Sequence, residues 1–191
     1  DPTCGSGTFC IEAAMMARQI APGLRRTFSF EEWNWVDDRL IQEVRTEASK
    51  KINRDLVLDI MGTDIDARMV EIAKENAQKA GVASDITFKQ MRVQDLRSEK
   101  INGVIISNPP YGERLSDDAG VTKLYAEMGE VFEPLKTWSK FILTSDENFE
   151  KKFGRQADKK RKLYNGTLKV DLYQFFGERV RRQATSEKGN I

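Results

Sequence analysis

The sequence contains no histidine and only two cysteines among its 191 residues. Without an imidazole group the protein cannot assemble a Ser-His-Asp triad, and most zinc sites are excluded as well. Cys4 and Cys10 do not make a disulfide framework, and the sequence has no CxxC motif. We therefore predict that the protein holds no metal ion and that its chemistry proceeds without histidine.

Long apolar segments are also missing. No apolar run approaches the ~20 residues that a membrane span requires, and no secretory signal is found near the start. Apolar residues make up 39% of the chain and charged residues 32%, which is ordinary for a soluble protein. A chain of this length suits one domain with a sizeable core. We predict a cytoplasmic protein with no membrane partner.

The net charge of +1 conceals an uneven distribution of charge. Lys151–Lys162 contains seven basic residues and one acidic residue, and the basic run RVRR follows at Arg179–Arg182. Such a patch can bind a polyanion. A solvated face or a frayed tail has the same composition, so charge alone leaves both interpretations open.

Helical and strand-like segments alternate along the chain, which is typical of an α/β fold with helices on both faces of a parallel sheet. In a helix predicted over residues 7–21, Phe9, Ala13, Met16 and Ile20 form an apolar stripe. Further strands are predicted at 56–62, 85–91, 103–107 and 140–145, and further helices at 67–80 and 124–135.

Several residues mark where these elements begin and end. Asp66 is the expected N-cap of the helix at 67–80, and Gly81 its stop. Asn165-Gly166 lies between two strand-like runs and predicts a β-hairpin. The predicted fold is a mostly parallel, doubly wound sheet with a C-terminal antiparallel hairpin.

Two stretches depart from this regular order. The chain opens with the strand-to-helix turn DPTCGSG, but the strand that should precede it is missing, so we predict a longer parent chain with the first strand upstream. About 35 residues separate the first helix from the next strand, where 2–6 are usual, which predicts a helical insertion at about residues 22–55. We expect Trp33 and Trp35 to anchor this insertion onto the domain. The predicted domain covers residues 1–183, and 184–191 are expected to form a flexible tail.

Asp1, Gly5 and Gly7 lie in the turn DPTCGSGT, which opens a helix. Glycines allow the backbone to approach a ligand, and a helix N-terminus attracts negative charge. A dinucleotide fingerprint would need a third glycine where Cys10 stands, and a phosphate-binding loop would need a lysine. The turn alone is also compatible with a purely structural role.

Three acids follow predicted strands. Asp64, at the tip of the strand in GTDID, can accept both hydroxyls of a ribose, whereas Asp66 more readily caps the following helix. Asp95 follows the next strand, where a carboxylate can accept the exocyclic amine of an adenine. Ligands of open α/β sheets bind at the carboxyl ends of the strands. The acids and the motif SNPPYGERL are all predicted to lie at such ends.

At this point the sequence resembles a known family. DPTCGSGT, GTDID, QD and NPPYGERL are similar to the motifs of Rossmann-like S-adenosylmethionine-dependent amino-methyltransferases. More narrowly, the chain resembles a THUMP-associated group of RNA methylases, long described as N6-adenine-specific DNA methylases, whose relatives methylate guanine N2 in ribosomal or transfer RNA. The resemblance implies S-adenosylmethionine as cofactor, RNA, most readily ribosomal, as substrate, and a THUMP-type RNA-binding domain upstream.

The resemblance also assigns roles by position. Asp64 would hold the ribose and Asp95 the adenine amine of the cofactor. Asn108, Pro109, Pro110 and Tyr111 would form the target-base site. Asp1, Gly5 and Gly7 would border the methionine end of the cofactor, and Thr3, Thr8, Ile65 and Asn108 are further expected contacts.

NPPY suits an exocyclic amine because the lone pair of such an amine is delocalised into the ring. The Asn108 side-chain oxygen and the Pro109 carbonyl can accept its two N–H groups, and Tyr111 can stack on the extruded base. Prolines set this geometry in advance. Guanine N2 in ribosomal RNA is the expected target; adenine N6 in DNA, guanine N2 in transfer RNA and a non-catalytic nucleic-acid-binding module are the alternatives.

Overall fold

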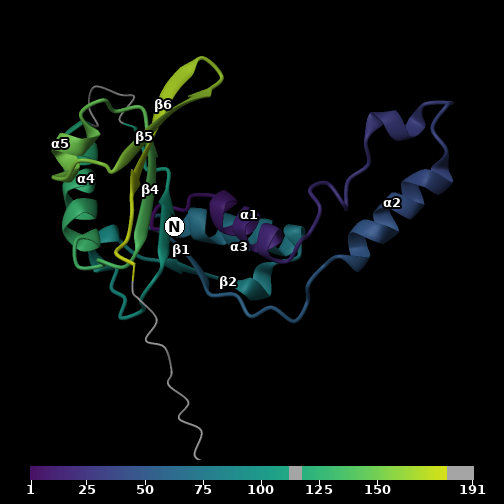
Figure 1. Ribbon diagram of the computed structural model, residues 1–191, viewed down its shortest axis with the longest axis horizontal. Coiled ribbons are helices and arrows are strands. Elements are labelled where there is room, and N and C mark those ends of the chain that lie inside the picture. The colour runs from purple at the N-terminus through teal and green to yellow at the C-terminus, as the bar shows by residue number, and fades with distance from the viewer. Residues whose placement is uncertain (112–117, 180–191) are drawn as a thin grey trace, which may run out of the picture. The chain divides into compact units, whose positions relative to one another are not determined.

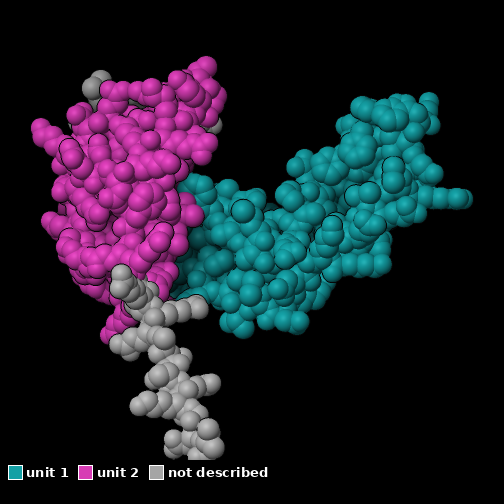
Figure 2. Space-filling model, viewed as in Figure 1, with its two compact units in different colours: residues 1–92 teal, residues 93–191 magenta. Residues whose placement is uncertain are grey.

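The computed structural model describes residues 1–111 and 118–179 (Figure 1). The end of the NPPYGERL motif, residues 181 and 182 of the RVRR run and the predicted tail at 184–191 therefore lie outside the described residues. The chain divides into two compact units, residues 1–92 and 93–191 (Figure 2). Among the described residues, no helix is long and apolar enough to cross a membrane.

The first unit contains a parallel pair of strands, β1 (Ile60–Asp64) and β2 (Ile86–Gln90), packed against helices α1 (Thr8–Ala17) and α3 (Ala67–Ala80). As predicted, Asp66 caps α3 by accepting a hydrogen bond from the Arg68 amide at 2.8 Å. Gly81, with a φ of +76°, ends it. The strand begins later than its apolar run predicts, because Leu56 and Val57 are exposed.

Helix α1 buries a different face from the predicted one. Its buried residues are Cys10, Ile11 and Ala14, whereas Met16 of the predicted stripe is 77% exposed. Small side chains allow the helix to approach the strands closely. A Cβ added to Gly62 of β1 would lie 3.0 Å from the Cys10 sulfur. The spacing of the larger apolar residues was therefore a misleading guide.

The predicted insertion is present in the first unit as a 3-10 helix (Ser29–Glu32) and helix α2 (Asp38–Lys50). The prediction that its tryptophans anchor it is wrong: Trp33 is 50% and Trp35 78% exposed. No residue of α2 is buried. Figure 1 shows α2 set apart from α1 and α3, which explains why these apolar side chains have no core to enter.

The second unit holds a four-stranded sheet in the order β3-β4-β6-β5. β3 (Val104–Ser107) pairs in parallel with β4 (Ser139–Thr144), while β6 (Leu168–Phe175) runs antiparallel to both β4 and β5 (Lys159–Asn165). The predicted C-terminal hairpin is thus confirmed, but its loop is Gly166–Thr167, one residue later than expected, because Asn165 still pairs with Leu168. Gly166 begins that loop with a φ of +62°.

An aromatic core fills the second unit beneath helices α4 (Asp118–Phe132) and α5 (Phe149–Phe153). The Phe149 ring lies 4.9 Å from that of Tyr125 and 4.7 Å from that of Tyr173. In α4, Met128 and Phe132 are buried as predicted, but Tyr125 enters the core rather than its neighbour Leu124. Parallel strands together with an antiparallel hairpin confirm the predicted α/β class, whereas the upstream first strand stays a prediction.

Candidate functional site

The glycine turn before α1 uses its two positive-φ glycines for different purposes. Gly5 has a φ of +51°, and a Cβ added there would meet no atom within 4 Å, so open space lies beside its backbone. Gly7 has a φ of +86°, and a Cβ there would lie 2.9 Å from the Phe88 ring. Gly5 therefore exposes the main chain, whereas Gly7 makes room for the core.

The carboxylate of Asp64 organises this end of β1. Its Oδ2 accepts a hydrogen bond from the Gly5 amide at 2.9 Å, and its Oδ1 accepts one from the Asp66 amide at 2.9 Å. A carboxylate offers about four acceptor positions, so each oxygen keeps capacity for a further donor. Ile65, the next residue along the chain, is exposed.

The segment Asp1–Cys4 lies along β1. The Thr63 amide donates to the Asp1 carbonyl at 2.8 Å, and the Cys4 amide donates to the Thr63 carbonyl at 2.8 Å. The Asp1 side chain accepts from the Thr3 amide at 3.1 Å. These bonds fix the turn at the carboxyl end of the strand, where the sequence predicts a ligand.

No side chain of the described residues caps the N-terminus of α1. Gly7 stands at the N-cap position, and the first turn, which begins at Thr8, contains no acidic residue. The first amide groups of a helix lack partners within the helix and favour negative charge. This helix end can therefore receive acceptor groups of a ligand.

Thr63 was not among the site residues predicted from the sequence. Its hydroxyl oxygen is buried, and within residues 1–111 and 118–179 it has no hydrogen-bond partner. Thr63 is buried on β1, and only the packing could show that its hydroxyl is unsatisfied.

The two cysteines beside the turn are buried and not bonded to each other. Burial raises the pKa of Cys4 to about 12, and burial also raises the pKa of Cys10. Both thiols therefore remain protonated at neutral pH, and neither is suited to act as a nucleophile.

The predicted target-base motif follows β3 in the second unit. Ser107 and Pro109 are buried, whereas Asn108 and Pro110 are exposed and Tyr111 is half-buried. The Tyr111 hydroxyl donates a hydrogen bond to Asn108 Oδ1. This bond orients the Asn108 amide and leaves its oxygen one further acceptor position.

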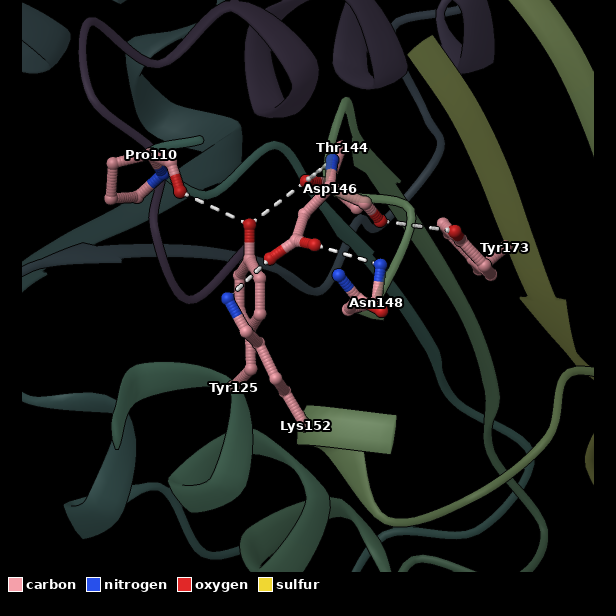
Figure 3. A network of polar contacts seen from close by, with 7 residues as sticks. All are labelled: Pro110, Tyr125, Thr144, Asp146, Asn148, Lys152 and Tyr173. Atoms are coloured by element: carbon pink, nitrogen blue, oxygen red, sulfur yellow. Dashed lines mark hydrogen bonds and ion pairs between the residues drawn. The ribbon is translucent and has the colours of Figure 1, made fainter. Parts of the chain in front are cut away.

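The carbonyl of Pro110 is held from below by Tyr125 of α4 (Figure 3). The Tyr125 hydroxyl donates to this carbonyl at 3.2 Å and also lies 2.8 Å from the Thr144 hydroxyl, which accepts from the Asp146 amide at 3.1 Å. Burial raises the pKa of Tyr125 to about 12, so its hydroxyl stays protonated and remains a donor at neutral pH.

Asp146, after the end of β4, connects this chain of bonds to the rest of the unit (Figure 3). Its carboxylate accepts from Lys152 Nζ at 2.8 Å and from the Asn148 amide at 2.8 Å, while its carbonyl accepts from the Tyr173 hydroxyl at 3.1 Å. Tyr125 and Asp146 were not among the site residues predicted from the sequence. The signal was present, since Asp146 comes shortly after the end of β4 and Asp64 stands at the end of β1.

Asp95 ends a short 3-10 helix (Val93–Asp95) at the start of the second unit. It is exposed, and its carboxylate has no hydrogen bond or ion pair with any other described residue. Within the first unit, the structure thus brings the glycine turn and Asp64 together. Within the second, it joins Asn108 to Tyr111. A shared cofactor pocket for all of them stays a prediction. In the described part of the chain, no group of three His, Cys, Asp or Glu side chains could hold a metal ion.

Comparison with known proteins adds independent findings. The family described as "UPF0020: RMKL-like, methyltransferase domain" matches residues 1–174. The Bacillus subtilis (strain 168) protein named "Putative RNA methyltransferase YpsC" is 52% identical over 186 residues, which cover 97% of this chain and 48% of that protein. The Shewanella amazonensis "Ribosomal RNA large subunit methyltransferase K/L" is 41% identical over 202 residues, which cover 100% of this chain and 28% of that protein.

A solved structure agrees with the fold. The crystal structure of SMU.472 complexed with SAH has a TM-score of 0.91 and 65% identity, with coverage of 95% of this chain and 48% of that one. The chain thus spans about half the length of two of these three relatives and less of the third.

Proposed function

The chain belongs to the RMKL-like methyltransferase domain family, as its motifs predict, and on that premise we propose that it methylates an exocyclic amine of an RNA base with S-adenosylmethionine. The target that we propose is N2 of guanine in ribosomal RNA. The observation that carries the proposal is the 2.9 Å hydrogen bond from the Gly5 amide to Asp64, because it joins a glycine turn to a strand-end acid, the pair that nucleotide-like cofactors require.

The relatives support the same function. One is named for methylation of large-subunit ribosomal RNA, and SMU.472 carries SAH, which is S-adenosylmethionine without its methyl group. Because the chain spans only part of these proteins, the proposal concerns the methyltransferase portion. An upstream THUMP-type domain that binds RNA stays a prediction.

The residues of the first unit suit the ribose and methionine parts of the cofactor. Asp64 would accept the ribose hydroxyls with the acceptor positions that the Gly5 and Asp66 amides leave. The open space beside Gly5 admits a ligand close to the backbone. The proposed contacts of the methionine end are Asp1, Thr3, Gly5, Gly7 and Thr8.

The adenine part would use an exposed apolar and an exposed polar group. Ile65 follows Asp64 and offers an apolar side chain for the face of the ring. Asp95 has a carboxylate available for the exocyclic amine. S-Adenosylmethionine, when bound, supplies a methyl group that is already activated on a sulfonium sulfur.

The residues after β3 would position the nucleophile. Asn108 Oδ1 and the Pro109 carbonyl would accept the two N–H groups of the amine and so favour a pyramidal nitrogen whose lone pair can attack. Tyr111 orients the Asn108 amide through its hydroxyl and would also stack on the extruded base. Orientation of this kind contributes up to ~7–11 kcal/mol in well-aligned reactions, so a strong base is not required.

The decisive experiment identifies the methylated nucleoside. The full-length protein would be incubated with methyl-labelled S-adenosylmethionine and, separately, with ribosomal RNA, transfer RNA and DNA, each digested afterwards and separated by chromatography. We expect labelled N2-methylguanosine from large-subunit ribosomal RNA. The same nucleoside from transfer RNA, or N6-methyladenine from DNA, would replace the proposed target with one of the two catalytic alternatives. No transfer, together with no heat of cofactor binding in calorimetry, would leave a non-catalytic nucleic-acid-binding module.

A further inference from the structure

The first unit contains a basic cavity that the proposed reaction does not use. It has a volume of about 690 Å³ and lies between the insertion, the end of α1 and the end of α3. Among the described residues that line it, Asp85 is the one acid. Its basic lining residues are Arg18, Arg25, Arg26, Arg45, Arg54 and Lys79.

Two of these cations build the walls of the cavity. Arg18 binds both carboxylate oxygens of Asp85 at 2.5 Å and donates to the carbonyls of Asn53 and Arg54. Arg45 donates to the Leu24 carbonyl at 2.6 Å and to the Glu31 carboxylate. Asp85 and Glu31 are therefore already paired, and they do not neutralise the other cations of the cavity.

Four exposed cations remain at the cavity. Arg25 donates a long hydrogen bond, 3.4 Å, to the Lys79 carbonyl, and the Arg26 guanidinium lies 5.6 Å from the centre of the Phe28 ring. The side chains of Arg54 and Lys79 have no hydrogen bond or ion pair with any residue that the structure describes. Cations gathered without acids create a positive potential that favours an anionic ligand.

A row of exposed aromatic rings begins at the edge of the same cavity. Gly23 lines the cavity, and a Cβ added to it would lie 2.5 Å from the Phe28 ring. From Phe28 the rings of Phe30, Trp33 and Trp35 follow in contact, with successive centroid distances of 5.7, 6.5 and 5.2 Å. Exposed rings in contact are suited to stack on unpaired bases.

We propose that the arginine-lined cavity and the aromatic row of the insertion bind a single-stranded segment of the RNA substrate. The cavity takes a phosphate group of the strand, and the rings of Phe30, Trp33 and Trp35 stack on bases of the adjoining nucleotides. The sign of the charge favours this partner over an apolar protein surface, and Trp35, 78% exposed, has the outermost ring of the row. The inference rests on the proposed function in one respect, namely that the substrate is RNA.

The test measures RNA affinity by fluorescence anisotropy with a labelled single-stranded oligoribonucleotide over a range of salt concentrations. For the Arg54→Gln/Lys79→Gln variant of the full-length protein, we expect the slope of log K against log salt to fall by about 1 for each phosphate that the variant no longer neutralises. For Trp35→Ala we expect affinity to fall on the order of 10-fold. Lys50→Gln/Lys51→Gln is the matched control, because these exposed lysines do not line the cavity.

The outcomes separate this inference from the proposed function. If the wild-type protein neither binds nor methylates RNA, the proposed function fails and the inference fails with it. If it methylates RNA but both test variants bind RNA like the lysine control, the inference alone is overturned. It is also overturned if Trp35→Ala changes only the sedimentation of the protein, because the row would then be a contact between protein surfaces. Calorimetry of cofactor binding and thermal unfolding show whether each variant is intact.

Discussion

The two units position their proposed functional residues by different means. In the first, Gly7 and Gly62 make room for the Phe88 ring, and Asp64 binds main-chain amides. In the second, side chains hold the site in place, because Tyr125 donates to the Pro110 carbonyl and Tyr111 donates to Asn108. The first unit should therefore be sensitive to added atoms, whereas the second should be sensitive to removed ones.

The largest effect is expected for removal of the Asn108 side chain. Asn108→Ala deletes the oxygen proposed to orient the target amine, and loss of one such polar group costs about 10²–10³ in turnover in comparable sites. The measurement is methyl transfer under single-turnover conditions, with cofactor affinity from calorimetry as control. Near-normal turnover would show that Asn108 does not position the target amine. The contrast between the two units would then fail for the second unit.

Gly7→Ala tests the first unit. The added Cβ would lie 2.9 Å from the Phe88 ring at a φ of +86°, so overpacking and backbone strain together should destabilise the protein by about 3 kcal/mol. Gly5→Ala is the matched control, because its φ is also positive but no atom lies within 4 Å of the new Cβ. We expect it to cost about 1 kcal/mol of stability while weakening cofactor binding. The free energy of unfolding is measured in urea. Equal losses of stability in the two variants would contradict the role that we assign to the missing side chain at Gly7.

The carboxylate at the end of β1 provides a third test. Asp64→Asn removes the charge that the proposal assigns to the ribose, and hydrogen bonds to a charged group contribute about 1.5–3 kcal/mol, so cofactor affinity should fall more than 10-fold. Asp66→Asn is the control, since Asp66 caps α3 by accepting from the Arg68 amide and asparagine is an equally good N-cap. Calorimetry that gave both variants the same affinity would contradict the assignment of Asp64.

The smallest effect is expected for Tyr125→Phe, which removes the donor to the Pro110 carbonyl without emptying the aromatic core. The variant also removes the contact with the Thr144 hydroxyl. One hydrogen bond contributes about 0.5–1.5 kcal/mol, so unfolding in urea should show a loss of about 1–2 kcal/mol for the two. Turnover should fall several-fold at unchanged cofactor affinity, because the loop that carries Asn108 loses one support. A variant with normal turnover would show that the Pro110 carbonyl is held well enough without Tyr125.

The insertion provides a second contrast, this time between two segments of the first unit. Around Gly7 and Gly62, the apolar side chains of the unit are buried against Phe88. In the insertion, the aromatic residues contact one another and remain exposed. The composition of the two segments therefore does not separate a core from a binding surface; the packing does.

Much of the candidate site follows from the sequence alone. Gly5 and Gly7 predicted a tight turn, and Asp66 and Gly81 predicted the limits of α3. The strand predicted at 103–107 does end at Ser107, shortly before Pro109 and Pro110, which have no amide hydrogen to donate to a sheet. These features are local: a cap, a positive φ or a missing amide acts within a few residues, and its effect is the same in any fold.

Only the tertiary structure decided which faces are buried and which distant groups meet. It buried Cys10 and Ala14 rather than Met16, and it left Trp35 in solvent. It also joined Gly5 to Asp64 across 59 positions, and Tyr125 to Pro110 across 15. Periodicity states that a helix has an apolar face, but the size of the neighbouring side chains determines how closely that face can approach, and no local pattern contains this information.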